Sequence, residues 1–155
     1  MHTPPLQQIE ELMRCDRIVA GGFFGRDTRS LEQIIADDAA ELARLGVSAA
    51  TLARRMKALR DLALAKLGNV VACGDEGLEV RIDENRGMLI CPFGDGTRHC
   101  KTVTHARRIK DGRELRWSDL NIHLIEAHGF FEGRGCAFRL EPAELVELRR
   151  SPSRG

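Results

Sequence analysis

The spacing of apolar residues changes its period at Gly68, and this change constrains the fold more than any other feature. Before Gly68, apolar residues recur every three or four positions, which predicts amphipathic helices. After it, short apolar runs alternate with polar residues, which predicts strands. The predicted helices begin at Pro5, Ser30, Ser48, Ser118 and Pro142. The predicted strands cover residues 70–72, 78–82, 88–90, 102–104 and 107–109. This order predicts an α+β fold with a small antiparallel sheet.

The same change of period divides the chain into three ranges. Residues 1–68 are predicted to form a helical subdomain, an N-terminal bundle of three helices. Residues 69–150 are predicted to form an α+β subdomain, and residues 151–155 a mobile tail of Ser, Pro, Arg and Gly. Because 155 residues is the size of one domain, we expect the two subdomains to pack as one compact unit. Asp38 interrupts the apolar stripe of the second helix, where it serves either as the partner of an arginine or as a functional acid.

Neither a membrane span nor a secretion signal is predicted from the sequence. No apolar run approaches the roughly 18 residues that a spanning helix needs. The first residues also lack the basic-then-apolar profile of a signal peptide, so we expect a cytoplasmic protein. Five cysteines are an odd number for a chain that is not secreted, which predicts reduced thiols rather than a disulfide framework.

Six cysteine and histidine residues gather in the second part of the chain, and this clustering predicts a metal site. They are Cys91, His99, Cys100, His105, His123 and His128. Cys91 follows a predicted strand and enters a turn-rich segment that leads to Cys100, while His123 and His128 lie on one predicted helix. We therefore predict one zinc ion per chain, held by Cys91, Cys100, His123 and His128. His99 and His105 are possible substitutes for Cys100.

An interpretation without metal stays open. In it, His123 is a hydrogen-bonded core histidine, His128 caps carbonyls at the helix end, and the cysteines are small buried residues.

This ligand set resembles that of the zinc finger with two cysteines and two histidines. The spacing departs from that family, because eight residues separate Cys91 from Cys100 where the finger has two to four. The 22 residues between Cys100 and His123 also exceed the finger's approximately twelve. The pattern therefore predicts the same ligand chemistry on another backbone. Positions five apart on a helix point about 140° from each other, so the last turn must bring His128 round to His123.

The segment from His123 to His128 also resembles the H-x-x-E-H motif of inverted zinc peptidases, with one residue inserted. This resemblance implies a zinc hydrolase with Cys91, His123 and His128 as ligands and Glu126 as general base. Thiolate ligands favour a closed structural site instead. Four protein ligands would therefore indicate a binding module, and three with a water would indicate a hydrolase.

Residues 45–55 resemble the turn and recognition helix of bacterial helix-turn-helix proteins. Gly46, Val47, Ser48, Thr51, Leu52 and Arg54 match that pattern. The resemblance implies nucleic-acid contact through Thr51, Arg54, Arg55 and Lys57. A plain helical hairpin is the alternative. Cations are also concentrated in residues 54–66 and 98–117, either for polyanion binding or as solvated faces.

The block from Trp117 to Gly133 is similar to one shared by a group of small bacterial cytosolic proteins. The similarity implies a cytosolic location and adds no activity. Together these features predict a zinc-stabilised binding or regulatory protein that contacts nucleic acid or a protein partner. The sequence leans against an enzyme and does not indicate an oligomeric state.

Overall fold

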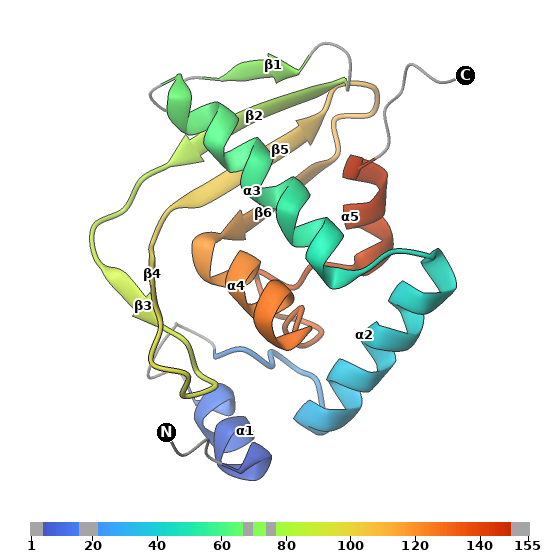
Figure 1. The fold of residues 1–155 in the computed structure, drawn as a ribbon, viewed down its shortest axis with the longest axis vertical. Coiled ribbons are helices and arrows are strands. Elements are labelled where there is room, and N and C mark those ends of the chain that lie inside the picture. Colours follow the sequence, from blue (N-terminus) through green and yellow to red (C-terminus); the bar gives the residue numbers. More distant parts are fainter. Residues whose placement is uncertain (1–4, 16–21, 67–69, 74–76, 150–155) are drawn as a thin grey trace.

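The computed structural model describes residues 5–15, 22–66, 70–73 and 77–149 (Figure 1). The helices are α1 (Leu6–Arg14), α2 (Leu31–Leu45), α3 (Ala49–Ala65), α4 (Asp119–His128) and α5 (Pro142–Arg149). The strands are β1 (Val71–Cys73), β2 (Leu78–Asp83), β3 (Met88–Ile90), β4 (Arg98–Cys100), β5 (Val103–Arg108) and β6 (Glu114–Ser118). The predicted tail 151–155 lies outside the described residues.

Two antiparallel sheets confirm the predicted α+β class. The larger sheet has the order β1-β2-β5-β6, with Val80 of β2 opposite Ala106 of β5 and Thr104 opposite Trp117 of β6. The smaller sheet is the hairpin of β3 and β4, in which Leu89 faces His99. This hairpin interrupts the connection between β2 and β5, and it reaches away from the larger sheet toward α4 and α1 (Figure 1).

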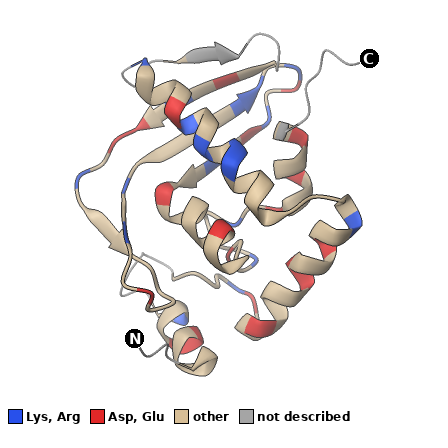
Figure 2. Cartoon of the chain, viewed as in Figure 1, with Lys and Arg blue, Asp and Glu red and all other residues tan. Residues whose placement is uncertain are grey.

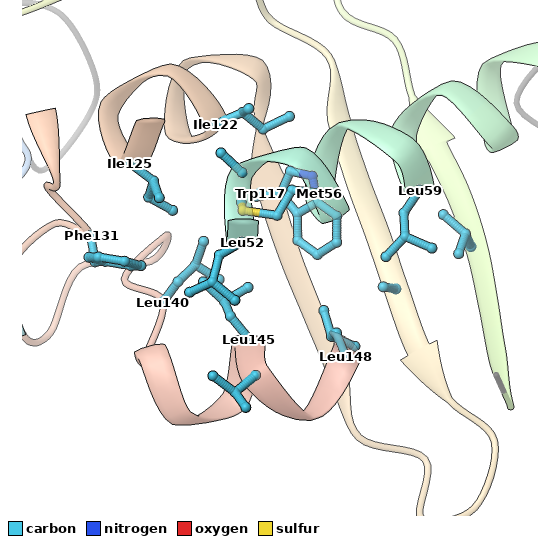
Figure 3. Packing of buried hydrophobic residues seen from close by; sticks show 14 of the residues in the cluster. Leu52, Met56, Leu59, Trp117, Ile122, Ile125, Phe131, Leu140, Leu145 and Leu148 are labelled. Carbon is cyan, nitrogen blue, oxygen red and sulfur yellow. The ribbon is translucent and has the colours of Figure 1, made fainter. Parts of the chain in front are cut away.

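The main core lies between α3 and one face of the larger sheet. Leu52, Met56 and Leu59 of α3 are at most 1% exposed, and Trp117 of the sheet, which lies beside them, is fully buried (Figure 3). Val80 of the sheet is also fully buried. Complete burial of one such side chain contributes about 1.5–3 kcal/mol. Helix α3 thus packs on the sheet and on α4, while α2 packs on α5 and α1. Within the α+β fold, α3 and the end of α2 therefore share the main core with the sheet, whereas α1 belongs to a second core, so the first three helices do not form a bundle of their own.

A second core joins the N-terminal segment to α4 and to the loop after β3. Its buried members are Ile9, Met13, Phe23, Phe24, Leu31, Ile34, Cys91, Phe93, Leu120, Leu124 and Phe130. The cluster includes Leu120 and Leu124 of α4 together with Cys91 and Phe93, so it holds the hairpin loop against this helix. The loop and α4 are the two elements that build the candidate site.

Helix α4 has the ends that were predicted. The Ser118 hydroxyl accepts a hydrogen bond from the Asn121 backbone N–H at 3.1 Å, and the Asn121 side chain accepts one from the Ser118 N–H at 2.8 Å. Gly129 ends the helix with a left-handed φ of 62°, which glycine adopts without strain.

Three strand predictions differ from the structure. Strand β4 was not predicted, and residues 102–104 and 107–109 contribute to the single strand β5. Residues 114–118 form β6, which was not predicted.

Other predictions concern single side chains. Asp38 is paired with Arg139 through two hydrogen bonds of 2.6 and 2.9 Å, as one of the two alternatives had it. Cys15, Cys91, Cys100 and Cys136 are free thiols. None of the helices described here has the length and apolar content that crossing a bilayer requires.

Candidate metal centre

The loop that joins β3 to β4 is closed at its base and folded around Asp95. The Cys91 N–H donates to the Thr97 carbonyl at 3.1 Å, which closes the loop. Inside it, the Thr97 N–H and hydroxyl both donate to Asp95 Oδ1, at 3.0 and 2.6 Å. These two bonds fix the Asp95 carboxylate, while its other oxygen, Oδ2, contacts the histidines of α4.

Two imidazoles of α4 meet this oxygen. His123 Nε2 lies 2.7 Å from Asp95 Oδ2, and His128 Nε2 lies 2.8 Å from the same atom. Cys91 Sγ is 3.5 Å from His128 Nε2. One ligand atom from each of the four residues lies within 4.8 Å of the other three. The structure thus brings one thiol, one carboxylate and two imidazoles to a single point.

Aromatic contacts hold both histidine rings in place. Phe93 stacks on His128 with ring centroids 3.9 Å apart and planes 8° from parallel. His99 stacks on His123 at 4.2 Å. His128 is the last residue of α4, and its ring and that of His123 both contact Asp95 despite their five-residue spacing. The two rings therefore lie at the same carboxylate oxygen.

The surroundings of Asp95 and Cys91 set the charge of these two groups. Burial raises the pKa of the Asp95 carboxyl, but hydrogen bonds from Thr97, His128 and His123 outweigh burial and hold that pKa well below its usual range. Asp95 is therefore ionised. Burial also raises the pKa of the Cys91 thiol to about 12. Without a cation beside it, this thiol stays protonated and is a poor nucleophile. A bound metal ion would reverse that, because coordination deprotonates a thiol.

The donor set fits zinc in both chemistry and spacing. Zinc prefers thiolate sulfur, imidazole nitrogen and carboxylate oxygen in a tetrahedron. Bond lengths of about 2.0 Å to N and O and about 2.3 Å to S place neighbouring ligand atoms about 3.3 to 3.6 Å apart. The His123 and His128 contacts to Asp95, at 2.7 and 2.8 Å, would need to lengthen by less than 1 Å. The Cys91 to His128 contact of 3.5 Å already matches.

Cys100 was predicted as a ligand, and the structure places it elsewhere. In β4 the exposed residues Arg98 and Cys100 alternate with half-buried His99, because neighbouring residues of a strand point to opposite faces. His99 faces the site, where its Nε2 lies 2.9 Å from the Thr97 hydroxyl. Cys100 therefore points away, and Asp95 completes the group of four in its place.

The two proposed substitutes for Cys100 lie in different places. His105 is on the larger sheet, where its ring nitrogens contact Asp83 at 2.8 Å and Glu114 at 3.0 Å. It is not part of the group. His99 is next to the group and stacks on His123, although its own nitrogen contacts Thr97.

Glu126, the predicted general base of the hydrolase alternative, does not face the four ligands. Both of its carboxylate oxygens accept hydrogen bonds from the Lys57 ammonium of α3, at 2.8 and 3.0 Å. Its side chain is 42% exposed. Glu126 is therefore not placed to activate a water at the group formed by Asp95 and its neighbours.

The residues predicted to contact nucleic acid lie on α3. Lys57 is paired with Glu126, and Arg55 reaches the Leu148 carbonyl at the end of α5. The Thr51 hydroxyl bonds to Ser48 at 2.9 Å, and Arg54 is exposed. Figure 2 shows these cations on α3 beside acidic residues of α4. Two of the four residues thus take part in contacts between helices.

Comparison of the chain with protein-family models, with curated proteins and with solved structures finds no match in any of the three. Function is therefore inferred from the geometry of the site.

Proposed function

We propose that this is a zinc-binding protein in which Cys91, Asp95, His123 and His128 hold one structural zinc ion. The observation that carries the proposal is the convergence of two imidazole Nε2 atoms and one thiol around a single fixed carboxylate oxygen. An ionised acid and three further donors, all within 4.8 Å of one another, form the arrangement that a tetrahedral ion requires.

A structural role is favoured over catalysis by the number of ligands. Four protein ligands fill a tetrahedral zinc and leave no position for a reactive water. The side chains of Asp95, His123 and His128 are 17 to 25% exposed, so an ion can reach the site from solvent. Bound there, the ion would join the hairpin loop to the last turn and a half of α4. Structural zinc contributes directly to folding, so we expect the hairpin to depend on it.

Zinc binding by matched variants tests this proposal. Purified protein is expected to contain one zinc per chain, and Cys91→Ser to lower zinc affinity by about tenfold or more. Cys100→Ser is the matched control, because this exposed cysteine lies outside the group, and its zinc affinity is expected to be unchanged. Equal loss of zinc in both variants, or purified protein without zinc, would refute the assignment.

Asp95→Asn separates the structural site from the hydrolase alternative. If Asp95 is a ligand, the amide that replaces its carboxylate binds zinc poorly. The zinc affinity of Asp95→Asn is then expected to be lowered, as is that of Cys91→Ser. In a site with three protein ligands and a water, zinc would remain bound to the Asp95→Asn protein. That result would favour an enzyme with Asp95, rather than Glu126, next to the water.

A second proposal is nucleic-acid contact through the first turns of α3. Two observations support it: Gly46 forms the left-handed turn between α2 and α3 with φ of 71°, and Arg54 is exposed. Binding to duplex DNA at about 50 mM salt is expected to weaken in Arg54→Ala and with added salt, because phosphate contacts release counterions. Arg86→Ala is the control, because this exposed cation between β2 and β3 lies outside both cation-rich ranges. Absence of binding at low salt would remove this proposal.

A further inference from the structure

A separate cavity of about 370 Å³ lies between the N-terminal segment, the β3–β4 region and the loop that follows α4. Its size falls within the range of small-molecule sites, about 300 to 1,000 Å³. Apolar walls come from Phe23, Leu89, Leu120 and Phe138. Glu132 is also part of the lining. A mainly apolar cavity with one acidic group has the composition of a binding site for an organic molecule.

Glu132 is held in this lining by a fixed partner. Asn121 Nδ2 donates to Glu132 Oε2 at 2.5 Å. The orientation of the Asn121 amide is fixed, because its oxygen accepts a hydrogen bond from the Ser118 N–H at 2.8 Å. The amide nitrogen therefore faces Glu132. The side chain of Glu132 is thus oriented by the same capping box that begins α4.

The backbone of Glu132 is strained. Its φ is 68°, and it is the one non-glycine residue with a positive φ among the residues that the structure describes. Two hydrogen bonds maintain this backbone conformation. Arg139 donates to the Glu132 carbonyl at 2.9 Å, and the Gly133 N–H donates to the Phe23 carbonyl at 2.8 Å. Strain that is maintained by surrounding contacts is concentrated at functional sites.

No cation in the described part of the chain forms a direct ion pair with the Glu132 carboxylate, and Arg139 acts on its charge only from a distance. Glu132 is 5% exposed. The Arg139 guanidinium is instead bound by both oxygens of Asp38 and by Glu141. Burial raises the pKa of the Glu132 carboxyl to about 7. A buried carboxylate of this kind is stabilised by a cation brought in with a ligand.

We propose that this cavity binds a small organic amine, whose ammonium group pairs with Glu132 and whose apolar body packs against Phe23, Leu120 and Phe138. A cation is favoured over an anion because the buried group is an acid. Lys101, the basic residue of the lining, is exposed and can remain in solvent. The proposal does not depend on zinc, because none of the four metal ligands lines the cavity.

Binding of three probes of matched size tests it by calorimetric titration of the purified protein at about pH 8, where Glu132 is ionised. The probes are phenethylamine, the neutral 2-phenylethanol and the anionic 3-phenylpropionate. The amine is expected to bind about tenfold more tightly than the alcohol, which is the typical contribution of one charge-assisted hydrogen bond. Equal binding of amine and alcohol, tighter binding of the acid, or no binding of any probe would overturn the proposal.

The variant Glu132→Gln tests whether the preference for the amine over the alcohol comes from this residue. The variant keeps the size of the side chain and its contact with Asn121, so it is expected to fold and to bind amine and alcohol alike. Glu32→Gln, an exposed acid on α2, is the matched control and is expected to keep the preference for the amine. A preference that survives in Glu132→Gln would refute the assignment, and a circular dichroism spectrum like that of the unaltered protein shows that the variant is folded.

Discussion

Glu132 makes the stability of this protein depend on pH in a direction opposite to that of an ordinary acid. Burial raises the pKa of Glu132 from 4.5 to about 7 in the folded state. Asn121, Cys136 and the paired Arg139 face this carboxyl, and their combined effect is smaller than that of burial. Because the folded pKa lies above the unfolded one, the folded state binds the proton more tightly. The stabilisation is complete below about pH 4.5 and is lost as the pH rises through about 7.

The expected size of the pH effect on stability follows from the pKa shift of Glu132. A difference of about 2.5 pKa units corresponds to about 3 kcal/mol between the two limits. Glu132→Gln removes this titrating group. The free energy of unfolding of the variant is therefore expected to increase relative to that of the unaltered protein as the pH rises. We expect the difference in unfolding free energy between variant and unaltered protein to increase by about 2 kcal/mol from about pH 5 to about pH 8.

Urea unfolding of both proteins at the two pH values measures this difference, and other titrating groups cancel in the comparison. Glu32→Gln controls for the loss of one negative charge, and its difference is expected to change far less with pH. A flat profile for Glu132→Gln, or one that falls with rising pH, would show that Glu132 is not a buried acid with a raised pKa.

Two further changes test the packing around the same loop. Asp38→Ala leaves the Arg139 guanidinium, whose side chain is 7% exposed, without its buried partner, and is expected to cost about 3 kcal/mol in urea unfolding. Glu41→Ala, which breaks the exposed pair with Arg44 on the same helix, is expected to change stability little, and equal effects would contradict the burial argument. Gly133→Ala would bring a methyl group into the Phe24 carbonyl oxygen and to 2.8 Å from Phe24 Cα, so its melting temperature is expected to fall sharply. An unchanged melting temperature would show that this close approach is not required.

Much of the fold could be predicted from local sequence signals. The caps of α2, α3 and α4 were found because Ser30, Ser48 and Ser118 each stand just before an apolar period, and each side chain accepts a backbone N–H in the structure. Strand β4 was missed because its three residues, Arg98–Cys100, contain no apolar run. Strand β6 was missed although its residues alternate between polar and apolar, because the alternation is brief and leads directly into the cap of α4. The partners of the helices were also beyond the sequence, since an apolar stripe does not show which surface covers it.

The candidate site was predicted only in part, because local sequence signals identified some of its residues and not others. Cys91, His123 and His128 were identified from residue type and spacing, and they meet in the structure. Cys100 was chosen because β4 was not recognised as a strand. In a strand, neighbouring residues point to opposite faces, so His99 and Cys100 could not both face α4. Asp95 was missed because an acid in a glycine-rich turn is common. Its pairing with Thr97, two residues on, is the local signal that fixes such a carboxylate.

X-ray absorption of the zinc-loaded protein tests the central claim most directly, because it counts the sulfur atoms bound to the ion. With Cys91 as the one thiolate, the spectrum is expected to fit one sulfur at about 2.3 Å and three nitrogen or oxygen atoms at about 2.0 Å. The same fit is expected for Cys100→Ser, while Cys91→Ser is expected to lose the sulfur shell. Two sulfur atoms in the unaltered protein, or a spectrum without sulfur, would contradict a zinc site built from Cys91, Asp95, His123 and His128.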